Sequence, residues 1–237
     1  MTKLTPTMFA RQSLVRLIPL LLVLPLAWAT TAHAADLQGD ARAGARKVDL
    51  CIGCHGIVGY QASFPEVYKV PKISGQGAKY ISNALVAYRA GERKHPTMRG
   101  VADSLTDQDI ADISAYYEQH GKVAGAPALP DEPARKPSAQ VAALLTKGTC
   151  VSCHGQNFSK PIDPSYAKIA GQNADYLYVA LKSYKTDNNP QFGRSNGVMA
   201  GIAKQFSNAD LKTLAGYIAS LDGDLKTVPE SRFHSAR

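Results

Sequence analysis

Two short cysteine motifs constrain this chain more than any other feature of its sequence. Segments 51–55 and 150–154 are CIGCH and CVSCH, and together they contain all four cysteines of the 237 residues. Three kinds of structure use such pairs: disulfides, a four-cysteine zinc site and covalently attached haem. A zinc site of this type has its pairs about 15–20 residues apart, whereas these motifs begin 99 residues apart. The histidine after each pair favours haem, because C-x-x-C-H is the attachment signature of c-type haem.

The spacing within each motif has a mechanical explanation. On a helical turn, residues i and i+3 lie on one face, so both thiols of a motif reach the edges of a single porphyrin. The histidine at the next position then brings an imidazole nitrogen to the iron. We therefore expect two covalent haems, each held by one motif: Cys51, Cys54 and His55 for the first, and Cys150, Cys153 and His154 for the second.

Residues 1–34 have the layout of a cleaved secretory signal peptide. Three basic residues precede the apolar stretch 17–29, and the small-x-small site Ala32-His33-Ala34 follows it. The stretch is shorter than the roughly 20 residues that span a bilayer. We expect cleavage after Ala34 and export to the periplasm, with an uncleaved anchor as the alternative.

The formal net charge of +8 includes the three basic residues of this leader, and removing them leaves +5. No basic block is interleaved with aromatic residues, so the sequence does not predict nucleic-acid binding.

The rest of the chain contains an internal repeat of about 100 residues. KISGQ at 72–76 is mirrored by KIAGQ at 168–172. Apolar positions then recur at helical spacing in both halves: Ile81, Leu85 and Tyr88 in the first, and Leu177, Leu181 and Tyr184 in the second. No convincing strand pattern appears, so the predicted fold class is all-α.

Each half also predicts a capped last helix. Thr106 with Asp109, and Ser207 with Asp210, have the spacing of a capping box with an apolar pair around it. Between the halves, residues 125–137 hold four prolines and favour a stiff, extended linker. We expect an N-terminal domain over 35–124, the linker over 125–137 and a C-terminal domain over 138–237.

Beyond the leader the chain has only two methionines, Met98 and Met199, which follow the motif histidines by 43 and 45 residues. A lone methionine usually fills a core, but two at matching places in two haem-binding halves predict axial iron ligands. His95 competes with Met98. Aligning the methionines places His95 opposite Asn196, so we expect His95 to be a surface loop residue.

Histidine/methionine ligation fills both axial positions of each iron and raises the reduction potential. This predicts an electron carrier and not an enzyme. In addition, the carbonyl of Pro71 is expected to accept a hydrogen bond from His55, and that of Ala167 from His154, fixing the tautomer of each ring.

With these motifs, the chain resembles the dihaem cytochrome c4 family over residues 39–221. The resemblance rests on two C-x-x-C-H-G motifs, two Gly-Gln segments, Gly91-Glu92-Arg93 before Met98, and the two capped helix starts. It implies a periplasmic carrier with two class I cytochrome c domains related by pseudo-twofold symmetry, their haem edges meeting near the interface. It further implies electron transfer from a bc1-type complex to a terminal oxidase, often of the cbb3 type, and leaves peripheral membrane association open.

Two departures from an even repeat stand out. Fifteen residues separate Tyr184 from Met199, against ten between Tyr88 and Met98, and Ala143 stands where the first half has Gly44.

Two other functions remain as alternatives. One is a dihaem electron-accepting subunit of a periplasmic dehydrogenase of the sulfide or alcohol type. The other is a dihaem enzyme, such as a peroxidase or a thiosulfate dehydrogenase. The dihaem enzyme is disfavoured, because Met98 and Met199 would occupy the remaining axial position of each iron and the chain has no fifth cysteine to serve as a ligand.

Overall fold

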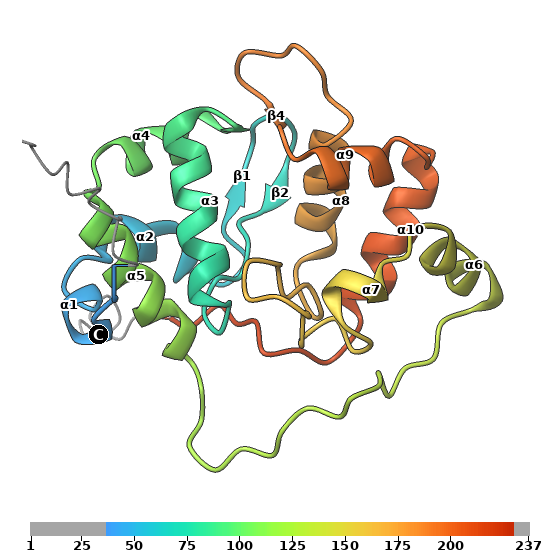
Figure 1. Cartoon of the computed structure of the whole chain (residues 1–237), viewed down its shortest axis with the longest axis horizontal. Coiled ribbons are helices and arrows are strands. Elements are labelled where there is room, and N and C mark those ends of the chain that lie inside the picture. The colour runs from blue at the N-terminus through green and yellow to red at the C-terminus, as the bar shows by residue number, and fades with distance from the viewer. Residues whose placement is uncertain (1–36, 230–237) are drawn as a thin grey trace, which may run out of the picture. The chain divides into compact units, whose positions relative to one another are not determined.

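A computed structural model describes residues 37–229, which fold mainly into helices (Figure 1). The first half contains α1 (Ala41–Gly44), α2 (Asp49–His55), α3 (Ala78–Ala90), α4 (Pro96–Asp103) and α5 (Asp107–Gln119). The second contains α6 (Ala139–Lys147), α7 (Val151–His154), α8 (Ala174–Ser183), α9 (Gly197–Ala203) and α10 (Asn208–Ala219). The strands of the described part are two-residue segments: β1 (Gln61–Ala62), β2 (Tyr68–Lys69), β3 (Arg93–Lys94) and β4 (Gly193–Arg194). The all-α class is confirmed. The expected signal peptide lies outside the described residues.

Both predicted capping boxes are present. At the start of α5, Thr106 Oγ1 accepts from the Asp109 N–H at 3.1 Å, and the Asp109 carboxylate accepts from the Thr106 N–H at 3.0 Å. Ser207 and Asp210 repeat both bonds at the start of α10, with the same two distances. Reciprocal caps of this kind satisfy main-chain donors that the helix itself leaves unpaired. The last helix of each half therefore begins where the sequence predicts.

Each half has its own apolar core. The first core joins α2, α3 and α5 through Val48, Ile52, Ile81, Leu85, Ile110, Ile113 and Tyr117. The second joins α6, α10 and the segments around α7 through Val141, Leu145, Phe158, Ala170, Phe206, Leu211, Leu214 and Leu221. Ile81 and Leu85 of α3 belong to the first core, and Leu177 of α8 packs with Ala215 and Ile218 of α10 in a further cluster, so these positions of the predicted helical periodicity are buried.

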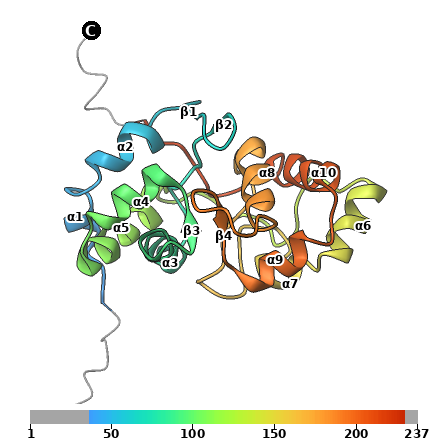
Figure 2. The same ribbon diagram turned by 90° about the horizontal axis from the view of Figure 1, so that it is seen from above.

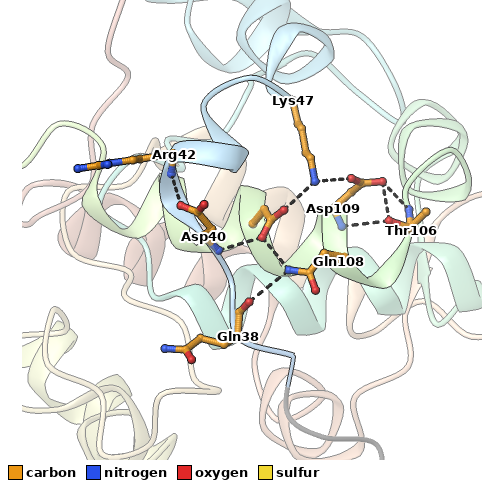
Figure 3. A network of polar contacts seen from close by, with 8 residues as sticks. Gln38, Asp40, Arg42, Lys47, Thr106, Gln108 and Asp109 are labelled. Atoms are coloured by element: carbon orange, nitrogen blue, oxygen red, sulfur yellow. Dashed lines mark hydrogen bonds and ion pairs between the residues drawn. The ribbon is translucent and has the colours of Figure 1, made fainter.

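In the first half, α1 crosses α5 with direct main-chain contact. A Cβ on Gly44 would lie 2.1 Å from the Asp112 carbonyl oxygen, so only glycine fits there. The Asp112 side chain accepts hydrogen bonds from the Asp40 N–H, Lys47 Nζ and Gln108 Nε2, and this network fastens α1 to α5 (Figure 3). In the second half Ala143 is exposed on α6, so the crossing at the corresponding position lacks this close approach.

The two halves exchange reciprocal hydrogen bonds. The Gln76 side chain donates to the Lys168 carbonyl and accepts from the Lys168 N–H, and Gln172 does the same with Lys72. Because Gln76 and Gln172 are equivalent in the repeat, as are Lys72 and Lys168, the contact has the self-complementary form of a twofold interface.

A second connection lies at β3 and β4, which pair antiparallel with Arg93 opposite Arg194 (Figure 2). The C-terminal segment also returns to the first half, where the Lys226 N–H donates to the Ser74 carbonyl at 3.0 Å. By contrast, the proline-rich segment 125–137 contains no helix or strand.

Candidate functional site

Both cysteine motifs form the predicted helical turns. In the first, Cys51, Cys54 and His55 lie on α2, with Asp49 in its first turn, where a carboxylate favours the helix dipole. In the second, Cys150 is the N-cap of α7, and its carbonyl accepts from the His154 N–H at 3.1 Å. The two thiols of each motif are therefore three residues apart on a helical turn, as attachment to a single porphyrin requires.

The two motif histidines are held alike. His55 Nδ1 lies 2.8 Å from the Pro71 carbonyl oxygen, and His154 Nδ1 lies 2.8 Å from that of Ala167. Both predicted bonds are confirmed. A carbonyl only accepts, so Nδ1 carries the proton and Nε2 keeps its lone pair. Burial lowers the pKa of both rings and the carbonyls offset part of that effect, which favours the neutral form a metal ligand needs.

Each methionine is the third residue of a short capped helix. The Met98 N–H on α4 donates to His95 Nδ1 at 3.3 Å, and the Met199 N–H on α9 donates to Asn196 Oδ1 at 2.9 Å. His95 Nε2 lies 3.0 Å from the Tyr68 hydroxyl. The expectation of a plain surface loop residue at His95 is thus wrong, because this side chain is the partly buried N-cap of α4. Its alignment with Asn196 is explained by their shared capping role.

One cavity of about 600 Å³ brings the predicted site residues together. It is lined by Cys51, Cys54, His55 and Met98 from the first half, and by Cys150, Cys153, His154 and Met199 from the second. Apolar side chains such as Leu85 and Leu177 form much of its wall. The sites of the two halves therefore adjoin a common space, and each motif histidine shares it with the methionine of its own half.

The four cysteines form no disulfide with one another in residues 37–229. All four cysteines are free and partly buried. Across residues 37–229, no three His, Cys, Asp or Glu side chains gather in a way that would hold a metal ion. Burial raises the pKa of the Cys51 thiol to about 11 and also raises that of Cys150, so before haem attachment both are neutral thiols at pH 7.

The donor set fits covalent haem. Covalently attached haem needs an apolar cavity, two thiols on one helical turn and a neutral imidazole nitrogen. Each half supplies its own pair of thiols and its own imidazole, and the apolar cavity is common to both halves. The motif helices supply the attachment cysteines, and His55 and His154 would each offer one iron ligand, oriented by the carbonyls of Pro71 and Ala167.

A group of arginine and tyrosine side chains at the cavity was missed by the sequence analysis. Arg93 and Arg194 line it together with Tyr80, Tyr88, Tyr176 and Tyr184. The repeat contains a signal for them, because each arginine stands five residues before the methionine of its half. Their pairing across β3 and β4 depends on how the halves meet.

Comparison with known proteins agrees with this geometry. The family model described as Cytochrome c matches the chain twice, over residues 41–120 and 138–222. Cytochrome c4 of Stutzerimonas stutzeri is 34% identical over 219 residues, covering 84% of this chain and 96% of the relative. A thiosulfate dehydrogenase electron acceptor of Stutzerimonas stutzeri strain A1501 is 29% identical over 222 residues, covering 86% and 94%. The crystal structure of reduced recombinant cytochrome c4 from Pseudomonas stutzeri matches with a TM-score of 0.56 at 28% identity, covering 78% and 100%.

Each family match contains one C-x-x-C-H motif, so the chain has two cytochrome c domains and two covalent haem c groups, attached at cysteines 51/54 and 150/153. With two such domains in tandem and high-coverage likeness to cytochromes c4 in sequence and structure, the chain belongs to the dihaem cytochrome c4 family, whose members carry electrons and are not enzymes.

Proposed function

We propose that the protein is a periplasmic carrier that passes electrons between respiratory complexes, with iron ligated by His55 and Met98 in the first half and by His154 and Met199 in the second. One observation carries the ligand assignment: each motif histidine, anchored through Nδ1, lines the same cavity as the methionine of its half. The side-chain caps at His95 and Asn196, which accept from the methionine N–H groups, support it by fixing the turn that bears each methionine.

The haem iron supplies reversible one-electron chemistry when it is bound. The chain's residues determine how that chemistry is used. The anchored imidazoles hold a single tautomer and orientation, and the soft thioethers of Met98 and Met199 favour ferrous iron. Two protein ligands on each iron exclude oxygen, peroxide and other substrates. The apolar wall keeps water from the site, which reduces the rearrangement that accompanies each change of charge.

We further propose that residues 35–124 and 138–237 are the two domains, joined by 125–137, and that cleavage after Ala34 releases the mature protein into the periplasm. In residues 37–229, no helix is both long and apolar enough to cross a membrane. The proposed electron donor is a bc1-type complex and the acceptor a terminal oxidase such as one of the cbb3 type.

The test of ligation is an optical spectrum of the purified, exported protein. Two covalent haems by pyridine haemochrome, the weak far-red band of ferric iron bound to methionine sulfur, and no reaction with carbon monoxide are the expected results. High-spin features or rapid carbon monoxide binding would contradict the proposal, because they require an open or labile axial position.

A second candidate function is that of electron acceptor for a dehydrogenase, which the likeness to a thiosulfate dehydrogenase electron acceptor favours. Stopped-flow reduction by a purified thiosulfate dehydrogenase with thiosulfate, compared with reduction by a bc1-type complex with quinol, separates the two donors. Faster reduction by the bc1-type complex supports the leading proposal, and faster reduction by the dehydrogenase supports the alternative.

A further inference from the structure

Two guanidinium groups face each other across the halves without an anion between them. Arg93 on β3 and Arg194 on β4 are opposite residues of the antiparallel pair, and both partly buried side chains line the apolar cavity. Within residues 37–229, neither guanidinium forms an ion pair with a carboxylate. Like charges placed directly opposite on paired strands repel, so this arrangement calls for a compensating group.

The existing partners of these arginines are tyrosines. Arg93 Nη2 donates to the Tyr176 hydroxyl of the other half at 2.7 Å, and Arg194 Nη2 donates to the same oxygen at 3.1 Å. Weaker bonds reach Tyr80 from Arg93 at 3.3 Å and Tyr184 from Arg194 at 3.4 Å. Tyr176 thus connects both guanidiniums, whereas the hydroxyl of its repeat counterpart, Tyr80, accepts from Arg93.

These phenols do not neutralise the two cations. Burial opposes ionisation of Tyr176, but the two guanidiniums outweigh it and lower the phenol's pKa to about 8, so this group is still mainly neutral at pH 7. Arg93 Nε, moreover, has no hydrogen-bond partner in the described part of the chain. A buried cation with an unused donor is costly unless an anion completes it.

The missing partner is recognisable from the chemistry of the group attached in each half. A guanidinium presents a planar fork of donors that matches a carboxylate. Haem c carries two propionate carboxylates, and the cavity that the arginines line is the one that both motifs share. We propose that Arg93, Tyr176 and Arg194 form one shared cation site that binds propionate carboxylates of both haems, so that each arginine affects the reduction potential of both.

Propionate binding at this site requires the two covalent haems but not the methionine ligands, so its failure and that of the ligand assignment are distinguishable. The shared site also couples each arginine to the haem of the other half. A guanidinium that served only the haem of its own half would tune that haem alone, whereas the bridge through Tyr176 predicts an effect across the interface.

The test compares Arg93→Gln and Arg194→Gln in the full dihaem protein. Each haem is followed in an anaerobic potentiometric titration by its own hyperfine-shifted methyl signals in the NMR spectrum. A nearby cation stabilises the reduced iron, so each substitution should lower both potentials and reduce the ratio of reduced to oxidised haem, at a fixed ambient potential, by about threefold or more. Arg99→Gln is the matched control, since it removes the same charge from an exposed side chain of α4. It should leave both ratios nearly unchanged.

An effect confined to the haem of the mutated half, or no effect at either haem, would overturn the shared site. Arg93→Lys is a second variant in case Arg93→Gln fails to fold. It keeps the positive charge but lacks the planar pair of guanidinium donors. In this variant, infrared difference spectra between the oxidised and reduced states should show altered carboxylate bands with both potentials close to those of the parent. Unaltered carboxylate bands would also overturn the proposal.

Discussion

At the scale of single residues, main-chain groups provide much of the positioning in both halves. Pro71 and Ala167 anchor the motif imidazoles through their carbonyls, so proline in one half and alanine in the other perform the same task. His95 and Asn196 likewise differ in chemistry but both accept from the N–H of a methionine. The equivalence of the halves therefore lies in hydrogen-bond geometry more than in residue identity.

Replacing Met199 by alanine tests the ligand assignment at this scale. Because attachment depends on Cys150 and Cys153, covalent haem content should stay at two, while one iron loses its second ligand and becomes high spin. Optical and electron paramagnetic resonance spectra measure the spin states. Met98→Ala is the matched variant and should convert the other haem. If both haems of Met199→Ala stayed low spin with the methionine band intact, Met199 would not be a ligand.

The cap at His95 gives a second prediction. His95→Ala removes the acceptor for the Met98 N–H and should lower the free energy of unfolding by about 0.5–2 kcal/mol. His95→Asn restores the acceptor that the second half uses at Asn196 and should recover most of that loss. Urea unfolding followed by circular dichroism compares the variants. Equal losses in both would show that the cap contributes nothing.

At the scale of elements, the halves differ in how their first and last helices meet. In the first half α1 touches the backbone of α5 at Gly44, and the buried Asp112 carboxylate gathers donors from Asp40, Lys47 and Gln108 (Figure 3). The equivalent position in the second half is the exposed Ala143. Backbone contact together with a buried, satisfied carboxylate holds α1, which is only one turn long.

Gly44→Ala tests this crossing. The added methyl group would meet the Asp112 carbonyl oxygen, so α1 must move away, at a cost of about 1–3 kcal/mol in the free energy of unfolding. Gly216→Ala on α10 is the control, because a Cβ there has no atom within 4 Å. That substitution should be neutral or stabilise by about 0.4–1 kcal/mol, since it lowers the entropy of the unfolded chain. Equal stability of the two variants would contradict the close crossing.

The carboxylate of Asp112 makes the first half sensitive to acid. Burial raises its pKa, but hydrogen bonds from Asp40, Lys47 and Gln108 outweigh burial, so the folded pKa lies below the usual value. Its contribution to stability is therefore present above about pH 4, the pKa in the unfolded chain, and is lost as pH falls through the folded pKa. Asp112→Asn should flatten this part of the curve of unfolding free energy against pH. The exposed Asp103→Asn, as control, should not.

At the scale of the whole molecule, reciprocal polar contacts join the halves, whereas each apolar core lies within a single half. Gln76 and Gln172 each make two bonds to main-chain groups of the other half. Both glutamines are buried. Loss of either leaves main-chain groups of Lys72 or Lys168 without these partners, which costs about 1–3 kcal/mol for each buried group that is left unsatisfied.

The variant carrying Gln76→Ala and Gln172→Ala should therefore loosen the interface while leaving each core intact. We expect hydrogen exchange to accelerate at residues 72–76 and 168–172, and thermal unfolding to separate into two transitions. Gln205→Ala is the control, because among residues 37–229 the side chain of Gln205 bonds within its own half, to the Gly201 carbonyl. Unchanged exchange in the double variant would mean that other contacts hold the halves together.

Local patterns in the sequence determined a large part of this protein. Four features were predictable: the C-x-x-C-H motifs, the capping boxes at Thr106 and Ser207, the apolar periodicity of α3 and α8, and the anchoring carbonyls of Pro71 and Ala167. Each depends on residues close together in the chain or on the repeat, where helix geometry alone relates spacing to position. The axial role of Met98 and Met199 stays a prediction from the same repeat.

Only the tertiary structure decided how the halves use one another. Four features join residues about 80–100 positions apart in the chain. They are the β3–β4 pair, the bonds between Gln76 and Lys168, the contact of Arg93 and Arg194 with Tyr176, and the cavity lined by both motifs. Such contacts leave no periodicity in a single sequence, because they depend on which surfaces remain once each core has formed. Two strands of two residues carry no detectable strand pattern, and they exist only because the halves meet there.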